Sequence, residues 1–260
     1  MTALVPLVAS AALVAAASAN AQEEPLPPDV VARVGEEPIG KREFRDWLRK
    51  TARGQDRRGG VPKPPRFERC IAAERRRLAT SRRRPSRRVL RLRCRRRYKQ
   101  LRDEVMQFLV QGAWTRQEAK ARAIVVPSRE VRRQFKRQKR QAFEKERAYR
   151  RFLRRSGMTQ ADILYRVKLD LLQTRITRQV TAAAPPVPPA EVTDYYESNR
   201  RRFRKMSRRK ARRVIRRLLR SQRQQQALDR FVKDFRERYT AVTVCAEGYV
   251  IAECSNAQGD

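Results

Sequence analysis

Two stretches of the chain, Val126-Pro127-Ser128-Arg129-Glu130-Val131 and Val187-Pro188-Pro189-Ala190-Glu191-Val192, share the pattern Val-Pro-x-x-Glu-Val. An aromatic residue follows at the same place in both copies, Phe135 in the first and Tyr196 in the second, with a further Phe beyond it. Pro with Ser or Ala begins a helical first turn, and the Glu lies where the helix dipole favours an anion. The two copies therefore predict two helices that begin in the same way, and the helical pattern between them indicates an all-helical framework.

Apolar residues recur at helical spacing along most of the chain. The exception lies near the N-terminus, where residues 30–34 read as a strand that turns at Gly35 and returns at Ile39. Gly157 suits the left-handed end of a helix, and Thr159 with Asp162 fits a cap at the start of the next helix. The other predicted helices cover residues 41–52, 66–80, 87–123, 128 into the 140s, and 208–239.

The chain carries 65 Lys and Arg against 27 Asp and Glu, a net charge of +38, and it has no histidine. The absence of histidine excludes Ser-His-Asp and Cys-His catalysis, His-ligated zinc and imidazole proton shuttles. The arginines run through every segment after the apolar N-terminus, which favours a compositional bias on solvated faces over a dedicated nucleic-acid module. Nucleic-acid binding and attachment to an anionic membrane or cell-wall polymer stay open as alternatives.

The first 21 residues read as an export signal. They carry no charged side chain, and the apolar run from Ala3 to Ala17 is too short for a comfortable membrane span. Ser18-Ala19-Asn20-Ala21 gives a small-x-small cleavage pattern. We expect cleavage after Ala21, a polar lead over residues 22–29, and a protein located in the periplasm, in the cell wall or outside the cell. The alternative is a retained leader that anchors the protein in the membrane.

Four cysteines follow the leader: Cys70, Cys94, Cys245 and Cys254. Export permits disulfides, and four cysteines allow three pairings. The simplest joins Cys70 to Cys94 across two antiparallel helices and Cys245 to Cys254 in a short C-terminal hairpin. A metal site of four thiolates is the alternative, although no C-x2-C spacing supports it. If the first disulfide forms, its loss should cost about 2–5 kcal/mol, and reduction should lower the melting temperature.

Several segments occur in a characteristic order between residues 30 and 240. The first is Val31-Ala32-Arg33-Val34-Gly35-Glu36-Glu37-Pro38-Ile39, followed by Glu43-Phe44. Gln117-Glu118-Ala119-Lys120 then precedes Ile124-Val125-Val126, and the two Glu-Val-to-Phe motifs follow. The last segment is Gln224-Gln225-Gln226-Ala227-Leu228 with Phe231-Val232. In this order the segments resemble exported chaperones of the SurA and PrsA type.

The resemblance implies a mostly α fold: a SurA/PrsA/trigger-factor-like helical chaperone module with a small N-terminal β-hairpin and a short disulfide-closed C-terminal hairpin. An arginine-rich helical hairpin around Cys70 and Cys94 looks like an addition to the family pattern. The expected parts are a helical domain at 30–181 with that hairpin inserted at 66–97, a Pro-Ala linker at 182–190, completing helices at 191–240, and a tail at 241–260.

Two residues depart from the family pattern. Gly40 stands where a Thr or Ser cap is more usual, and Ala123 stands where a Gly often ends the helix. The parvulin-type isomerase domain of typical members is also missing, because Phe203 is followed almost at once by the final helix near Arg208. Parvulin sites resemble one another in using histidines. The resemblance therefore implies a holdase without isomerase activity, catalytic residues, cofactor or metal, which binds unfolded or nascent exported polypeptides.

A holdase needs exposed apolar surface in a groove. Aromatics at helical spacing form ordinary core more often than binding surface, and both interpretations stay open here. Tyr195 and Tyr196 stand out, because adjacent helical residues diverge by about 100° and are hard to bury in one interface. The alternative function is a basic cell-surface protein that binds polyanions or nucleic acid on the same fold. The candidate client-binding residues are Phe108, Trp114, Phe135, Tyr149, Phe152, Tyr195, Tyr196 and Phe203.

Overall fold

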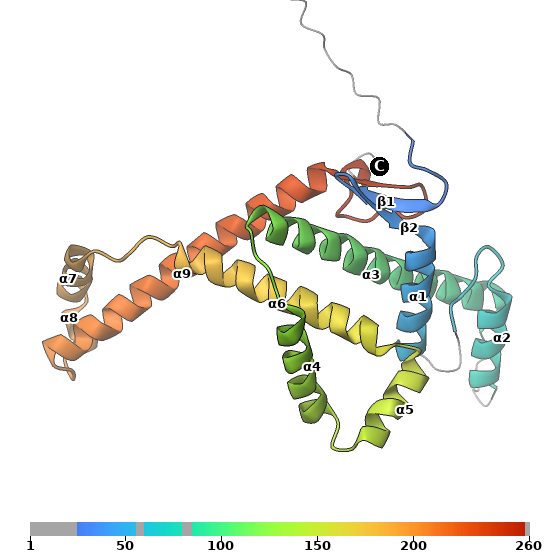
Figure 1. Cartoon of the computed structure of the whole chain (residues 1–260), viewed down its shortest axis with the longest axis horizontal. Helices are drawn as coiled ribbons and strands as arrows, with labels where there is room; N and C mark the ends of the chain where they lie inside the picture. Colours follow the sequence, from blue (N-terminus) through green and yellow to red (C-terminus); the bar gives the residue numbers. More distant parts are fainter. Residues whose placement is uncertain (1–24, 56–59, 80–84, 258–260) are drawn as a thin grey trace, which may run out of the picture.

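A computed structural model describes residues 25–55, 60–79 and 85–257, which are mostly helical (Figure 1). The one sheet of this part has three strands in the order β2-β1-β3. β1 (Val30–Val34) and β2 (Glu37–Gly40) form the predicted hairpin, with Gly35 at φ 53° in its turn. β3 (Thr243–Cys245) pairs antiparallel with the other edge of β1. The first and last described segments of the chain are thus joined in one sheet.

The tail differs from the expected hairpin. It contributes a single strand, β3, followed by a turn and the short 3-10 helix η1 (Ser255–Ala257). The predicted disulfide between Cys245 and Cys254 closes this segment. Pairing with β1 explains the difference, because the free edge of β1 has backbone groups that need hydrogen-bond partners. The tail supplies them and buries Thr243 there, which a separate hairpin would not do.

The long helix α3 (Arg87–Ala121) is the centre of the molecule. It packs against α1 (Lys41–Gln55), α6 (Gln160–Ala182) and the sheet around the main apolar core. The approach of α3 to α6 is close at Gly112, where an added Cβ would lie 3.2 Å from the Tyr165 hydroxyl. Glycine here lets the two helices pack closely.

The first copy of the repeated motif forms α4 (Ser128–Ala142), which packs on α6 around a second apolar core. α5 (Glu146–Ser156) follows and completes a corner visible in Figure 1. Arg175 of α6 donates hydrogen bonds to the motif's Glu130 and to the carbonyl of Val125. One arginine therefore holds both the motif and the residue before it.

The connection between α5 and α6 is the one that the sequence predicts. Gly157 ends α5 at φ 70°. The backbone N–H of Asp162 donates to the Thr159 hydroxyl at 3.2 Å, and the backbone N–H of Thr159 donates to the Asp162 carboxylate at 2.7 Å. This reciprocal cap satisfies donors that the helix itself cannot pair.

The second copy of the motif lies in an arm that projects from the body (Figure 1). The arm contains α7 (Pro189–Ser198), α8 (Arg200–Phe203) and the first part of α9 (Arg208–Ala241), with a small apolar core of its own. Arg223 of α9 donates to the motif's Glu191 and to the carbonyl of Pro186. These are the positions that Arg175 holds in the first copy, so the sequence repeat is also a structural repeat.

The arginine-rich hairpin consists of α2 (Glu68–Arg77) and the first turns of α3. The predicted disulfide joins Cys70 to Cys94, with Cα atoms 6.0 Å apart. Phe67, Ile71 and Leu90 complete a small buried cluster around it. The hairpin thus has a core separate from that of the body.

The predicted leader, residues 1–21, lies outside the described residues. Within the described residues, no helix has both the length and the apolar character that a membrane span requires.

Candidate client-binding site

A cavity of about 480 Å³ opens between α3, α6 and α9. Its apolar surface comes from Trp114 on α3, Ile176 on α6, and Phe231 and Phe235 on α9. Val232, on the same turn of α9, is 53% exposed and lies at the edge of the cavity. A solvent-exposed Val beside a cavity floored by aromatic rings is unusual for an ordinary core, and it makes this cavity the first candidate for binding apolar groups.

The cavity floor is fixed by the packing of Trp114. Its indole N–H donates to the Thr243 hydroxyl at 2.8 Å, and its ring packs against Phe235 and Tyr239, with the ring centroids 5.8 Å away in both cases. Thr243 belongs to β3, so the tail strand orients a side chain of the cavity. Buried tryptophans usually find a partner for the N–H in this way.

Amide side chains form the polar part of the wall. Gln107 and Gln111 donate to one carboxylate oxygen of Glu253, at 2.8 and 3.2 Å. Glu253 is buried, and these two hydrogen bonds satisfy one of its carboxylate oxygens. Gln173 lies across the cavity on α6. Amides both donate and accept, so this wall can pair with the backbone of a bound peptide.

A smaller cavity of about 270 Å³ shares Gln111 and Gln173 with the first and continues along α3 and α6. The Arg166 guanidinium lies 4.5 Å from the ring centroid of Phe108 and 5.0 Å from that of Trp47. Burial lowers the pKa of Arg166, although nearby carboxylates act in the opposite direction. The side chain still carries its charge at neutral pH, since arginine titrates far above it. Asp170, one turn further along α6, also lines the smaller cavity, so this wall carries a cation and a carboxylate side by side.

A buried carboxylate joins α3 to the end of α9 behind the larger cavity. Glu118 is 2% exposed and accepts hydrogen bonds from Arg122, Arg238 and the Tyr239 hydroxyl, the last at 3.2 Å. Burial, and next the Glu118 carboxylate, raise the pKa of Tyr239 to about 12. This network holds α9 against α3, and these two helices form two walls of the larger cavity.

Residues 66–177 match a family described as SurA-like N-terminal domain. This stretch of the chain is a SurA-like N-terminal domain. No curated protein and no solved structure matches the chain. Domains of this kind bind unfolded client proteins, which points to a chaperone-type role.

The SurA-like domain starts at α2 and runs into α6, so it includes the disulfide-linked hairpin. It supplies two walls of the larger cavity, Trp114 and Ile176 among them. The third wall, on α9, lies outside the matched residues. The cavity is thus completed by a part of the chain that the SurA-like domain does not contain.

The structure distributes the predicted client-binding aromatics over four places. Trp114 lines the larger cavity and Phe108 the smaller one. Tyr149 packs against Phe135, and both are buried in the corner formed by α4 and α5, where Phe152 is 37% exposed. In the arm, Phe203 is buried, and its ring contacts the half-buried Tyr195 and Tyr196. The eight side chains do not line one groove.

Phe231, Val232 and Phe235 were not among the side chains that the sequence predicted for client binding, and Phe231 and Val232 entered only through the resemblance to exported chaperones. A signal was present in the adjacent pair Phe231-Val232. Adjacent helical residues cannot both point into one core, which is the argument that singled out Tyr195 and Tyr196. The same argument applied to α9 would have indicated an exposed apolar edge.

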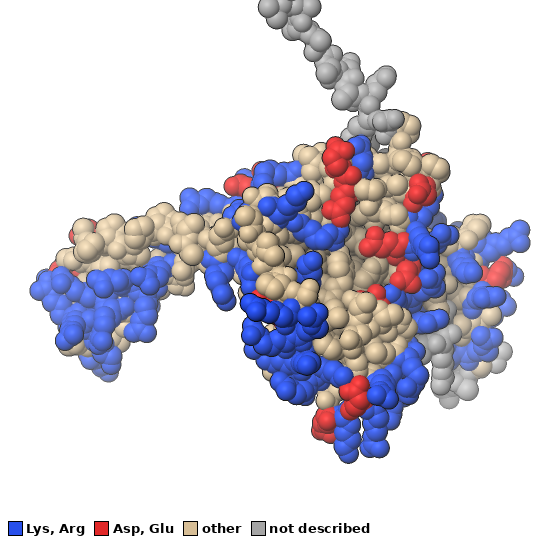
Figure 2. All heavy atoms as spheres, viewed as in Figure 1, with Lys and Arg blue, Asp and Glu red and all other residues tan. Residues whose placement is uncertain are grey.

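Positive charge covers much of the surface around the SurA-like domain. Figure 2 shows Lys and Arg over α4 and over the lower side of the arm, with an uncharged surface beside α4 on the corner that α4, α5 and α6 form. The exposed cations of α4 are Arg129, Arg132, Arg133, Lys136, Arg137 and Arg140. Those at the end of the arm are Arg200, Arg201, Arg202, Arg204, Lys205, Arg208, Arg209 and Lys210.

Proposed function

We propose that this protein is an exported holdase that binds unfolded polypeptides in the larger cavity and has no isomerase activity. The observation that carries the proposal is the open cavity with its apolar floor, two walls of which belong to a SurA-like domain. An unfolded chain presents apolar side chains and unpaired backbone groups. The rings of Trp114 and Phe235 on the cavity floor can contact the apolar side chains, and the amides of Gln111 and Gln173 can form hydrogen bonds with the backbone groups.

Two observations support an extracytoplasmic location. SurA-like families act outside the cytoplasm, and both disulfides of this chain are of a kind that persists in oxidising compartments. The absence of histidine supports the non-catalytic part of the proposal, since the histidines used by parvulin-type sites are missing.

The basic surface favours a second candidate function, binding to anionic polymers of the cell surface or to nucleic acid. The cations of α4 and of the arm are exposed to solvent, and both groups are visible in Figure 2. Binding of this kind releases counterions and weakens steeply with added salt. Apolar binding in the cavity does not weaken in this way, so salt separates the two functions.

The test is light scattering from an unfolded, uncharged client protein mixed with residues 22–260. We expect suppressed aggregation at about 0.15 M salt, where the Debye length is about 8 Å, and at several times that concentration. Suppression that disappears at high salt would assign the activity to the basic surface instead, and no suppression at all would refute the holdase.

A matched pair of variants connects this activity to the cavity. Val232→Asp places a charge at the cavity edge, where the wild-type side chain is 53% exposed, and should abolish most of the suppression. Val125→Asp makes the same change at a side chain that is 72% exposed and does not line the cavity, and should retain it. Equal activity of the two variants would remove the cavity from the proposal.

A further inference from the structure

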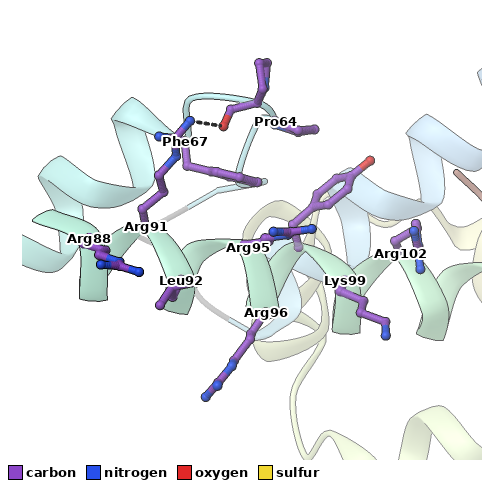
Figure 3. A pocket seen from close by; sticks show the side chains of 11 residues that line it. Pro64, Phe67, Arg88, Arg91, Leu92, Arg95, Arg96, Lys99 and Arg102 are labelled. Atoms are coloured by element: carbon purple, nitrogen blue, oxygen red, sulfur yellow. Dashed lines mark hydrogen bonds between the residues drawn. The ribbon is translucent and has the colours of Figure 1, made fainter.

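A second and larger hollow lies on the hairpin, away from the proposed client site. It has a volume of about 900 Å³ and lies between the loop before α2 and the first half of α3 (Figure 3). We name it the hairpin groove. Its lining residues are Pro64, Pro65, Phe67, Arg88, Arg91, Leu92, Arg95, Arg96, Tyr98, Lys99 and Arg102.

The loop and helix that form the hairpin groove are held together by several contacts. Arg91 donates to the carbonyl of Pro65 at 3.3 Å, and the rings of Phe67 and Tyr98 pack with centroids 6.3 Å apart. The disulfide between Cys70 and Cys94 ties α2 to α3 and belongs to the same buried cluster as Phe67. The groove is therefore preorganised and costs little conformational entropy to fill.

The groove is strongly cationic. Six of its lining residues are Arg or Lys, none is Asp or Glu, and all six lie on α3. Arg102 is neutralised by Asp103 at 2.6 Å. Across residues 25–55, 60–79 and 85–257, no carboxylate forms an ion pair with Arg88, Arg95, Arg96 or Lys99. Like charges one helical turn apart repel, so an anionic occupant would be stabilised here.

The apolar part of the groove shows what kind of anion fits. Single-stranded nucleic acid binds on exposed aromatic faces, but Phe67 is only 6% exposed and its ring is packed against Tyr98. What the groove offers instead is aliphatic surface, from the two prolines and from Leu92, which is 47% exposed. A polymer whose every unit is charged would leave this surface unused, whereas a polypeptide with acidic and aliphatic side chains would cover it.

The length of the groove agrees with a short peptide. The cations run from Arg88 to Arg102 along α3, and at 1.5 Å per residue this distance is about 21 Å. An extended chain advances 3.3–3.6 Å per residue, so about six residues would span it. Acidic side chains at alternate positions would then lie on one side, facing the row of cations.

We propose that the hairpin groove binds acidic, aliphatic-rich segments of unfolded polypeptides in an extended conformation. This inference rests on the proposed holdase function and specifies a client class: chains that carry such an acidic segment in addition to the apolar groups held in the cavity. Two sites on one protein raise the affinity for one long client without any new contact.

The test uses fluorescence anisotropy with a labelled eight-residue peptide of alternating Glu and Leu, and with its Gln-and-Leu analogue. The full exported chain should bind the acidic peptide at least about tenfold more tightly, the ratio that about 1.4 kcal/mol gives. Arg95→Gln with Lys99→Gln should remove most of this preference. Equal binding of both peptides by the wild type would overturn the proposal.

The chain offers a matched control for the charge change. Arg216 and Arg220 lie four residues apart on an exposed face of α9, as Arg95 and Lys99 do on α3, and they line a different surface hollow. Arg216→Gln with Arg220→Gln also removes two positive charges and should weaken binding of the acidic peptide less than about twofold. An equal loss in both double variants would mean that net charge, not the groove, binds the peptide.

Leu92→Ser tests the aliphatic part of the groove, with Val89→Ser as its control, since Val89 is 40% exposed on the same helix and lies outside the groove. Leu92→Ser should weaken binding of the acidic peptide, and Val89→Ser should not. A poly-dT octamer or inorganic polyphosphate that binds more tightly than the peptide, with no effect of Leu92→Ser, would refute the polypeptide assignment.

The readouts keep the two proposals separate. The groove variants should leave suppression of an uncharged client unchanged, because such a client occupies only the cavity. A wild-type protein that suppresses aggregation but binds the acidic and the neutral peptide equally would refute the groove alone. If suppression is absent in the wild type while the groove binds the acidic peptide, the holdase fails and the groove is a peptide site of another function.

Discussion

At the scale of single residues, Ala123 is the clearest conflict between sequence and backbone. It follows α3 with φ 53°, a left-handed conformation that non-glycine residues rarely adopt. The sequence departs from its family here, where Gly often ends the helix. Because a Cβ in this conformation costs about 1–2 kcal/mol, the site is strained and a glycine would relieve the strain.

We therefore predict that Ala123→Gly stabilises the protein by about 0.5–1 kcal/mol, after the greater freedom of glycine in the unfolded chain is subtracted. Chemical denaturation of both proteins measures the difference. Ala121→Gly, at the last residue of α3, is the control and should destabilise by up to about 1 kcal/mol, the cost of glycine within a helix. A destabilising Ala123→Gly would show that the left-handed turn carries no strain.

Tyr239 gives a prediction on pH dependence. Burial and the Glu118 carboxylate raise its pKa from 10.0 to about 12, so the folded state holds the phenol proton more tightly than the unfolded state. The stability from this residue is fully present below pH 10 and is lost as the pH rises toward 12. Raising the pH through this range should lower the free energy of unfolding.

The measurement compares wild type with Tyr239→Phe in urea at several pH values. The variant lacks the hydrogen bond to Glu118 and should be about 1–2 kcal/mol less stable at pH 8. The difference should shrink between pH 10 and 12, because only the wild type must release the buried proton. A difference that stays constant over this range would contradict the assignment.

At the scale of elements, locally specified features could be predicted from the sequence and long-range ones could not. The cap of Thr159 and Asp162, the end of α5 at Gly157 and the hairpin of β1 and β2 depend on residues a few positions apart. The partner of β3 is β1, from the other end of the chain, and three residues of weak alternation do not specify it. The disulfide that closes the tail was predicted correctly, but the pairing of its strand with β1 was not, for this reason.

The candidate site shows the same division. Trp114 was predicted as a site residue, but its neighbours Phe231 and Phe235 come from a helix far along the chain. No pattern within α3 indicates that α9 closes the cavity. The hairpin groove was missed for a different reason: basic residues are so frequent that five arginines and a lysine along one helix do not stand out until Pro64 and Phe67 are placed beside them.

The arginine clamps were also invisible in the sequence, and they yield an element-scale prediction. Arg223 holds α7 to α9 through Glu191 and the carbonyl of Pro186. Lysine cannot reproduce two contacts made by one planar group, so Arg223→Lys and Arg223→Gln should both loosen the arm. Limited proteolysis should cut the linker at residues 183–188 several-fold faster in these variants.

Arg200→Gln is the control for the clamp. Arg200 pairs with Glu197 on the surface of the arm and is 70% exposed, so its loss should leave the cleavage rate unchanged. Unchanged cleavage in the Arg223 variants would mean that the apolar core of Val192, Ile215 and Leu219 holds the arm without help from the clamp.

At the scale of the whole molecule, the described residues form four buried clusters rather than one. The hairpin and the arm each have a small core and carry basic surface, whereas the cavity lies where the two larger cores meet around Trp114 and Ile176. Such an arrangement suits a holdase, because apolar surface is concentrated at one place while charge keeps the complex soluble.

The net charge of +38 should make the folded protein more stable as salt is added. Ion pairs such as Lys50 with Asp162, 2.7 Å apart, are stabilising and weaken with salt, but these two side chains are only 11% and 15% exposed and are little screened. Repulsion among exposed arginines acts against the compact state and is screened strongly. Raising salt from about 0.01 to 0.1 M shortens the Debye length from about 30 to 10 Å.

We predict that the melting temperature rises by a few degrees over this range of salt. For a chain of this size, such a rise corresponds to an increase of about 1 kcal/mol in the free energy of unfolding. A variant with Arg213, Arg216, Arg217 and Arg220 changed to Gln tests the cause, because these four cations share one exposed face of α9. It should melt higher than wild type at low salt and respond less to added salt. Scanning calorimetry measures both proteins, and a melting temperature that falls with salt would show that ion pairs outweigh repulsion in this molecule.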